Sequence, residues 1–446
     1  MTWNFETRQI HAGQIPDAET GSRALPIYQT TSYVFDSVDQ AANRFALSEL
    51  GPIYTRLNNP TNEVVENRIA DLEGGIGALL VSSGQAAETL AILTVAQQGD
   101  NIVSSPSLYG GTRNLFANTL PRFGVDIRFI DDPEDPAAWE ALADERTVAF
   151  FGETIPNPKG DILDIEAVAA AAHRVGVPLI VDNTVATPYL LRPIEWGADI
   201  VVHSATKYLG GHGTAVAGAI IDAGTFDFGA DPQRFPRFNE PDPSYGGLVY
   251  ARDFGPNSPF GANVSFIFKC RLEGQRDFGF AASPFNAFLI AQGIETLSLR
   301  LERHVANARA VAEYLEGKDG VAQVRYASLK SSPYYTLAQK YTPRGAGAIV
   351  TADLAGGREA GRAFIDALTL HSHVANIGDV RSLAIHPAST THSQVPDEGL
   401  AAAGITPGTV RLSVGLEHID DILADIHAGL AAARAVATTE PQQAIV

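Results

Sequence analysis

The chain has 446 residues, of which 45% are hydrophobic and 19% are charged, and its formal net charge is −19. A chain of this length has room for two or three domains with a large core, and its composition is that of a soluble enzyme-sized protein. The acidic balance argues against nucleic acid or an anionic membrane as a partner, because phosphate groups bind to basic surfaces.

The first residues and the cysteine content bear on location. The opening sequence MTWNFETRQIHAG has no apolar segment, so we expect no signal peptide. No run approaches the roughly 18 apolar residues that a membrane span needs. Cys270 is the one cysteine, which excludes an intrachain disulfide. We therefore expect a cytoplasmic protein.

Residues 1–65 are polar and rich in turn-forming residues, and they lack a core pattern of their own. Such an arm usually packs on another part of the molecule or on a neighbouring subunit. From about residue 66, apolar strands alternate with amphipathic helices, which predicts a mostly parallel sheet covered on both faces, an α/β fold. Ligands of such sheets bind at the carboxyl ends of the strands. The predicted strands are 77–83, 101–105, 125–131, 147–153, 178–183, 198–204 and 215–222.

Two further regions follow the last of these strands. Residues 223–262 are rich in Gly, Pro, Asp and Phe, which predicts an irregular surface insertion within a large domain of residues 66–283. A long helical pattern over about 284–316 opens a smaller α+β domain, residues 284–446. Its other predicted elements are a strand at 347–354, a helix at 358–370, a loop-rich stretch, a strand at 409–415 and a closing helix before frayed last residues.

Polar residues follow three of the apolar strands. Gly84 and Gln85 form a strand-to-helix turn, where free N–H groups favour a phosphate. Asp182 ends the strand LIVD, and a carboxylate at that depth needs a partner. The strand VVH is followed by Ser204, Thr206 and Lys207.

Each of these features alone also fits an ordinary role: a βα turn, a helix cap and a solvated surface lysine. Together they suit pyridoxal 5'-phosphate (PLP). The lysine would join the cofactor's aldehyde as an imine, the carboxylate would keep the ring nitrogen protonated, and the turn and the hydroxyls would hold the phosphate.

At these motifs the chain resembles the PLP-dependent enzymes of transsulfuration and methionine metabolism, which have the fold-type-I, aminotransferase-like fold. The resemblance extends over residues 5–435 and is strongest to the O-acetylhomoserine sulfhydrylases. The motifs that carry it are QTTSYVF (29–35), YTRLNNPT (54–61), SSGQAA (82–87), LYGGT (108–112), ETIPNP (153–158), VDNT (181–184), HSATKYLGGHG (203–213), ANIGDVRSLAIHPASTTH (375–392) and VRLSVGLE (410–417).

The resemblance implies roles for single residues. Lys207 corresponds to the lysine that binds the cofactor, Asp182 to the partner of the ring nitrogen, and Tyr109 to the tyrosine that stacks on the ring. Asn157 lies near the ring hydroxyl, with Glu153 as a neighbour, and the phosphate is held by Gly84, Gln85, Ser204 and Thr206. The family often has Met where Gln85 stands.

Other matched positions concern the substrate and the quaternary structure. Arg411 corresponds to the arginine that binds the substrate α-carboxylate, for which a two-pronged guanidinium is suited. Asn376 lies in the substrate-binding segment. Tyr54 and Arg56 correspond to residues that reach the cofactor phosphate of the adjoining subunit, and Tyr54 also to a substrate contact. The resemblance therefore implies a homo-oligomer, a tetramer built from two dimers.

The implied reaction is γ-replacement: sulfide displaces acetate from O-acetylhomoserine to give homocysteine, for methionine biosynthesis. Cystathionine γ-synthase, cystathionine γ-lyase and methionine γ-lyase use the same residues and remain alternatives. Gly111 stands where methionine γ-lyases tend to have cysteine. His386 and His392 are six apart with no carboxylate or thiolate at ligand spacing, so we expect no metal. A dinucleotide fingerprint is absent.

Overall fold

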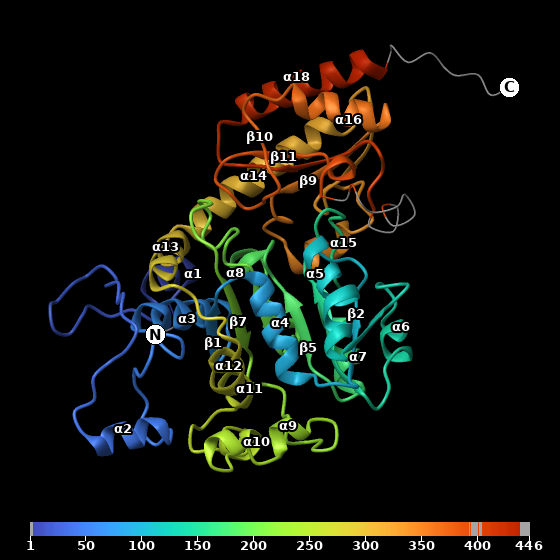
Figure 1. Cartoon of the computed structure of the whole chain (residues 1–446). Helices are drawn as coiled ribbons and strands as arrows, with labels where there is room; N and C mark the ends of the chain where they lie inside the picture. The colour runs from blue at the N-terminus through green and yellow to red at the C-terminus, as the bar shows by residue number, and fades with distance from the viewer. Residues whose placement is uncertain (1–2, 392, 394–399, 401–403, 438–446) are drawn as a thin grey trace.

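The computed structural model describes residues 3–391, 393, 400 and 404–437, and it has three parts. A large domain with a seven-stranded sheet lies below a smaller domain, and an N-terminal arm extends from the side of the large domain (Figure 1). His392, the residues on either side of position 400 and the last residues of the chain lie outside the described part.

The sheet of the large domain has the strand order β1-β7-β6-β5-β4-β2-β3. The strands from β6 to β3 pair in parallel, whereas β7 is antiparallel to both β1 and β6. The predicted mostly parallel sheet is confirmed. Its strands are β1 (Gly77–Val81), β2 (Asn101–Ser104), β3 (Asp126–Phe129), β4 (Thr147–Glu153), β5 (Leu179–Asp182), β6 (Ile200–His203) and β7 (Gly218–Asp222).

Both faces of this sheet are covered, which explains why its strands are continuously apolar. In β1, Ala78 and Leu80 pack into one hydrophobic cluster, and Leu79 and Val81 pack into the cluster on the opposite face. The helices and single turns of the large domain are α3 (Pro60–Glu73), α4 (Gly84–Val95), α5 (Gly110–Asn114), α6 (Pro136–Ala141), α7 (Ile165–Arg174), α8 (Thr187–Leu190), α11 (Ser265–Lys269), α12 (Arg276–Phe278) and α13 (Pro284–Ile294).

Helix α4 begins where β1 ends, and its first turn has a defined cap. The side chain of Ser83 accepts a hydrogen bond from the backbone N–H of Ala86 at 3.1 Å, as an N-cap serine does. Because α4 packs against β6 and β7, its amino end stands beside the carboxyl ends of the parallel strands. The positive end of the helix dipole therefore faces the edge at which ligands of such sheets bind.

The segment 223–262 is more ordered than its Gly- and Pro-rich sequence predicts. It contains two short helices, α9 (Pro236–Asn239) and α10 (Tyr250–Asp253). Phe228 and Phe238 are buried and stack with their ring centroids 4.1 Å apart. Phe228 also stacks on Phe266 of α11, at 5.9 Å. The expectation of a purely irregular surface insertion is therefore wrong, because buried aromatic rings anchor this segment to the core of the large domain.

The smaller domain has a five-stranded sheet in the order β10-β11-β12-β9-β8, with α16 and α18 packed together over it (Figure 1). The strands at 349–354 and 409–413 lie where they are predicted, whereas β8, β10 and β11 are not predicted. The elements are α14 (Leu297–Leu315), β8 (Val321–Arg325), α15 (Tyr335–Tyr341), β9 (Ile349–Leu354), α16 (Gly357–Asp366), β10 (Ser372–His373), β11 (Leu383–Ile385), β12 (Thr409–Ser413) and α18 (Ile419–Ala437).

Two predicted domain boundaries fall elsewhere in the structure. The boundary at residue 65 lies inside α3, a helix that already packs on the large sheet. The boundary before residue 284 lies before α13, which packs against α3, and Asn62 of α3 donates a hydrogen bond to the carbonyl of Ala282 at 3.0 Å. The long helical pattern is two helices, α13 and α14, and only α14 leads into the smaller domain.

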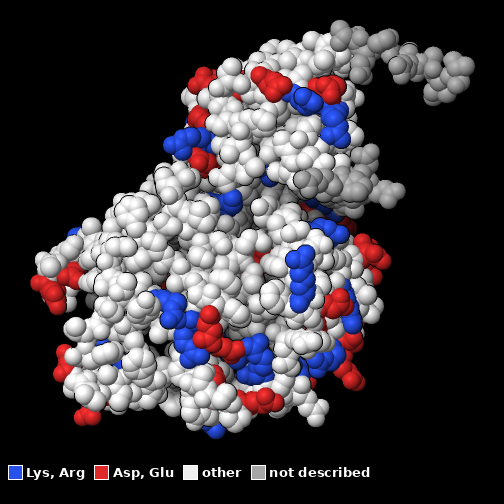
Figure 2. All heavy atoms as spheres, viewed as in Figure 1, with Lys and Arg blue, Asp and Glu red and all other residues white. Residues whose placement is uncertain are grey.

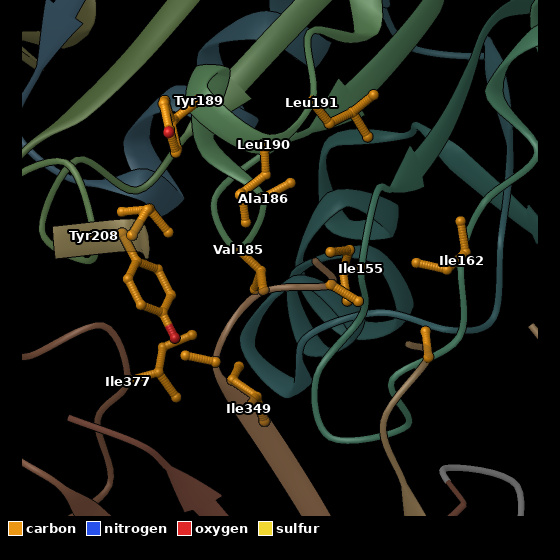
Figure 3. Packing of buried hydrophobic residues seen from close by; sticks show 14 of the residues in the cluster. Ile155, Ile162, Val185, Ala186, Tyr189, Leu190, Leu191, Tyr208, Ile349 and Ile377 are labelled. Atoms are coloured by element: carbon orange, nitrogen blue, oxygen red, sulfur yellow. The ribbon is translucent and has the colours of Figure 1, made fainter. Parts of the chain in front are cut away.

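A shared hydrophobic cluster joins the two domains. In Figure 3, Tyr208 and Val185 of the large domain point toward Ile377 and Ile349 of the smaller domain. All four side chains are buried. Since Tyr208 follows Lys207 and Ile377 follows Asn376 in the sequence, this packing sets the positions of two predicted site residues relative to each other.

The N-terminal arm contains α1 (Phe5–His11) and α2 (Val38–Phe45), neither of which is predicted. Several apolar side chains of the arm are exposed in the single subunit, including Val34 at 92% and Val38 at 84%. On the molecular face in Figure 2, acidic and basic side chains are interspersed, and a broad uncharged band crosses the middle of the view. No helix among the described residues is both long and apolar enough to cross a membrane.

Candidate active site

A cavity of about 240 Å³ opens between the two domains, at the carboxyl ends of β4, β5 and β6. Ten of the twelve predicted site residues line it. They are Gly84, Gln85, Tyr109, Asn157, Asp182, Ser204, Thr206, Lys207, Asn376 and Arg411. The two that do not line it are Tyr54 and Arg56 of the arm.

One end of the cavity is shaped to accept an anion. The N–H groups of Gly84 and Gln85 open α4, where no intrahelical acceptor is available to them. A Cβ atom on Gly84 would lie 2.7 Å from Cβ of Ser204, so only glycine allows this approach of the helix to the turn after β6. Thr206 Oγ1 accepts a hydrogen bond from the backbone N–H of Ala217 at 3.1 Å. The Thr206 hydroxyl also donates to the carbonyl of Ala217 at 3.2 Å. The helix terminus, Ser204 and Thr206 line the same cavity, an arrangement that suits a phosphate.

Lys207 follows β6 and enters the cavity from the sheet side. Its Nζ donates a hydrogen bond to Oδ1 of Asn376 in the smaller domain at 2.5 Å. Burial lowers the pKa of Lys207, and the positive charge of Arg411 lowers it further. Both effects favour the neutral amine, which is the form that can act as a nucleophile or a base.

Two carboxylates end neighbouring strands. Glu153 of β4 and Asp182 of β5 are paired in the sheet register and both line the cavity. The backbone N–H of Thr184 donates to Asp182 Oδ1 at 2.7 Å, and that of Tyr109 donates to Glu153 Oε1 at 2.6 Å. Burial raises the pKa of both carboxyls, and the charge of Asp182 raises the pKa of Glu153 further. A cationic ring nitrogen beside Asp182 would lower the pKa of this carboxyl and so oppose the effect of burial.

Arg411 of β12 closes the cavity from the smaller domain. Its Nη1 donates to Asn157 Oδ1 at 2.8 Å, and its Nη2 donates to the carbonyl of Asn376 at 3.1 Å. Its Nε is buried and has no partner among the described residues. Burial lowers the pKa of Arg411 to about 10, so the guanidinium still carries its charge at neutral pH. It is therefore a cation with an unused donor, suited to a carboxylate.

Tyr109 lies at the mouth of the cavity, and its ring is held over Gly111. A Cβ atom on Gly111 would lie 2.4 Å from Cε1 of Tyr109, so a larger residue at position 111 would displace the ring. About half of the Tyr109 surface is exposed in the single subunit. An exposed aromatic face beside a cavity is available to stack on a planar ligand.

Tyr54 and Arg56 lie on the exposed arm and not in the cavity of their own subunit. The guanidinium of Arg56 is 5.4 Å from the ring of Tyr54, and its Nη1 donates to the carbonyl of Arg276. The two side chains are therefore held together on the surface. Their predicted role in the site of an adjoining subunit stays a prediction.

The cavity also has lining residues that sequence reasoning did not find. Glu88 lies one helical turn after Gly84 on α4, so the i, i+4 spacing was the signal that could have identified it. The other newly found lining residues are Ser83, Ile155, Thr184, Val185, Val216, Ala375 and Ile377, with Glu153 present as the predicted neighbour. Three of the apolar members, Ile155, Ala375 and Ile377, lie within motifs quoted above, whereas Val185 and Val216 lie outside them.

Of the two histidines considered for a metal site, the structure describes His386. His386 is buried, and its Nε2 lies 2.8 Å from the carbonyl oxygen of Pro407. His392 lies outside the described residues. No group of three or more His, Cys, Asp or Glu side chains that could hold a metal ion occurs among the described residues.

Comparisons with known proteins agree with this geometry. The model of the family described as Cys/Met metabolism PLP-dependent enzyme matches residues 6–431. An O-acetyl-L-homoserine sulfhydrylase of Corynebacterium glutamicum is 54% identical over 96% of this chain and 97% of its own length. An O-acetyl-L-homoserine sulfhydrylase of Leptospira meyeri is 53% identical over 96% of this chain and 98% of its own. A homocysteine synthase of Schizosaccharomyces pombe is 51% identical over 95% of this chain and 97% of its own length.

A solved structure is similar over nearly the whole chain. It is a crystal structure of a candidate O-acetylhomoserine (thiol)-lyase of Campylobacter jejuni subsp. jejuni that contains N'-pyridoxyl-lysine-5'-monophosphate. The TM-score is 0.91 at 40% sequence identity, and the match covers 96% of this chain and 100% of the other. The fold-type-I architecture predicted from the sequence is thereby confirmed.

Proposed function

This chain belongs to the Cys/Met metabolism PLP-dependent enzymes, and from that premise we propose that it replaces the acetate of O-acetylhomoserine with sulfide. The products are homocysteine and acetate, in a step of methionine biosynthesis. The observation that carries the proposal is the single cavity in which the phosphate cradle, the lysine, the carboxylate and the carboxylate-binding arginine meet. Relatives about half identical in sequence bear the names O-acetyl-L-homoserine sulfhydrylase and homocysteine synthase.

The residues of the cavity fit PLP. Lys207 would hold it covalently, the amino end of α4 with Ser204 and Thr206 would hold its phosphate, and Asp182 would contact its ring nitrogen. Tyr109 would stack on the ring, and Asn157 would lie near the ring hydroxyl. When bound, PLP takes up the negative charge that remains after a proton leaves a substrate carbon.

The side chains then have separate tasks in the reaction. The unused Nε of Arg411 and its two Nη groups can bind the α-carboxylate of the substrate, in place of the contacts to Asn157 and Asn376. Burial favours the neutral amine of Lys207, which can take the proton from Cα. It can take a second proton from Cβ after it has passed the first to bound PLP, which would hold that proton until it returns to the substrate. Asn376 accepts a hydrogen bond from the amine of Lys207 and so orients it.

The bond changes balance. The acetate group leaves Cγ with the bonding electron pair after the Cβ proton has been removed, and the sulfur of sulfide forms its bond to Cγ. The two removed protons then return to Cβ and Cα, so these carbons carry as many hydrogens in the product as in the substrate. Lys207 is the one amine among the described residues that line the cavity, and burial favours its neutral form.

We also propose that two subunits build each site, with Tyr54 and Arg56 of one arm serving the cavity of the adjoining subunit. The exposed apolar side chains of the arm support this, because such surfaces mark an interface. A tetramer and a cytoplasmic location stay predictions of the sequence.

Product identification tests the function. Purified protein is incubated with O-acetylhomoserine or O-succinylhomoserine, each with sulfide, with cysteine, or alone, and Lys207→Ala is the inactive control. Homocysteine from O-acetylhomoserine and sulfide is expected. Cystathionine as the main product would instead identify a cystathionine γ-synthase, and a 2-oxo acid formed from methionine or cystathionine would identify a γ-lyase. Gly111 favours the first outcome over a methionine γ-lyase, because Tyr109 occupies the space of a larger side chain.

A further inference from the structure

Glu88 is a buried carboxyl group in the cavity to which the mechanism above assigns no task. It lies in the second turn of α4 and is 3% exposed. Its Oε1 accepts a hydrogen bond from Oγ1 of Thr112 at 2.9 Å. Its Oε2 is buried and has no hydrogen-bond donor as a partner among the described residues. A buried carboxyl oxygen without a hydrogen bond destabilises the folded state, unless the oxygen is protonated or accepts a hydrogen bond from another group.

The neighbour that can complete the bonding of Glu88 is Asp182. The two carboxyls line the same cavity and lie within reach of a hydrogen bond between them. No ion pair among the described residues includes Glu88, Asp182 or Glu153, so two buried carboxyls and the partly buried Asp182 face one cavity without a paired cation. Two carboxylates in contact cannot both ionise at neutral pH, because the repulsion adds to the cost of burial.

The surroundings decide which member of the pair holds the proton. Asp182 receives a hydrogen bond from the N–H of Thr184, and the nearby His203 ring favours its charge. Glu88 receives only the Thr112 hydroxyl, and the negative charge of Asp182 opposes its ionisation. Burial and the charge of Asp182 raise the pKa of Glu88 well above its usual range.

We propose that Glu88 is a positioning residue that carries the proton of a Glu88–Asp182 carboxyl pair and donates it in a hydrogen bond to Asp182. Asp182 then remains the ionised member and keeps one orientation. This proposal rests on the role proposed for Asp182 at the ring nitrogen. A neutral donor suits that role, because it stabilises the aspartate charge without cancelling it, as a lysine or arginine at position 88 would.

Two substitutions separate this role from plain packing. In Glu88→Gln the amide N–H₂ can donate to Asp182 while the amide oxygen still accepts from Thr112, so the geometry and the charge are kept. In Glu88→Leu the volume is nearly kept and the donor is lost. Thermal unfolding of both variants shows that each is folded before its site is compared.

The first measurement uses the protein without cofactor. Infrared difference spectra of wild type against Glu88→Gln at neutral pH should show a carbonyl band of a protonated carboxyl in the wild type only. Absence of that band from the difference would show that Glu88 is ionised and would overturn the proposal, whatever the turnover assay gives. This outcome is distinct from a failure of the proposed function, which only product identification reports.

The second measurement uses the holoenzyme loaded with PLP labelled with ¹⁵N in the ring. In Glu88→Gln the ring-nitrogen chemical shift and kcat should stay near those of wild type. In Glu88→Leu the shift should move toward that of an unprotonated ring, and kcat should fall about tenfold, the factor that one pKa unit represents. A Gln variant that loses rate as the Leu variant does, with the same change in shift, would mean that Glu88 acts as a charged group.

Discussion

The amine of Lys207 and the side-chain oxygen of Asn376 lie 2.5 Å apart, although one residue belongs to the large domain and the other to the smaller domain. The residues that follow them, Tyr208 and Ile377, pack in the hydrophobic cluster shared by the two domains (Figure 3). The position of the reactive amine is thus fixed from both sides of the cavity.

This relationship predicts a shift in pH dependence for Asn376→Asp. A carboxylate in place of the amide favours the ammonium form of Lys207, so it opposes the lowering of the pKa by burial. The rising limb of kcat against pH should therefore move to higher pH, by roughly one unit. Asn376→Ala serves as the comparison: it should lose rate by about tenfold to a hundredfold from the missing hydrogen bond, without that shift. An unmoved limb in the Asp variant would mean that Asn376 does not contact the working amine.

Asp182→Asn should leave the fold and cofactor binding in place and slow turnover by at least about tenfold, since a hydrogen bond to a charged group contributes about 1.5–3 kcal/mol. The asparagine has no charge with which to keep a ring nitrogen protonated. Steady-state kinetics and the visible absorbance of the bound cofactor test this prediction together. An unchanged rate would mean that Asp182 only accepts the hydrogen bond from the N–H of Thr184 and has no part in the reaction.

Mixing variants tests whether the arm serves a neighbouring site. Arg56→Ala should weaken cofactor retention, and Lys207→Ala should be inactive. Mixed dimers of the two contain one intact site, so random exchange should restore about a quarter of wild-type activity. Arg8→Ala is the matched control, because this arm arginine pairs with Asp71 of its own subunit at 2.7 Å. If subunits that have verifiably exchanged show no recovery, the arm serves its own site.

Cys270→Ser should keep near-normal activity, and thiol-alkylating reagents should not inactivate the enzyme. Cys270 is fully buried, is not among the residues that line the cavity, and has its Sγ 3.3 Å from Thr94 Oγ1 of α4. Burial raises the pKa of the thiol to about 12, so the reactive thiolate is absent at neutral pH. Activity after alkylation is the measurement; loss of activity by both alkylation and substitution would require a thiol in the site.

The sequence predicted the central sheet because its strands are runs of apolar residues bounded by turns, and such runs have one stable arrangement in an α/β protein. It located Asp182 because this residue ends such a run, and Lys207 because it lies in the turn that follows one. Short strands such as β10 (Ser372–His373) carry no periodic signal, and their pairing partners are distant in the sequence. The insertion was misjudged because Gly and Pro suggested a loop while the buried Phe228 and Phe238 decided the packing.

The residues of the site differ in how far the sequence identifies them. The i, i+4 spacing places Glu88 on the same face of α4 as Gly84, but the spacing alone does not show that this face meets a cavity. Asn376 and Arg411 could be matched to motifs, but their contacts to Lys207 and Asn157 depend on how two domains pack. Distances between side chains from separate domains are a property of the folded chain.

In the proposed two-subunit arrangement, the exposed apolar side chains of the arm, such as Val34 and Val38, would make cofactor retention depend on protein concentration. Under the two-subunit arrangement, self-association and cofactor binding are reciprocal: each strengthens the other by the same factor. Dilution should then release cofactor from an otherwise intact protein, and added cofactor should recruit monomers into dimers by mass action. At a low concentration of the chain, much of it would therefore be monomer without cofactor.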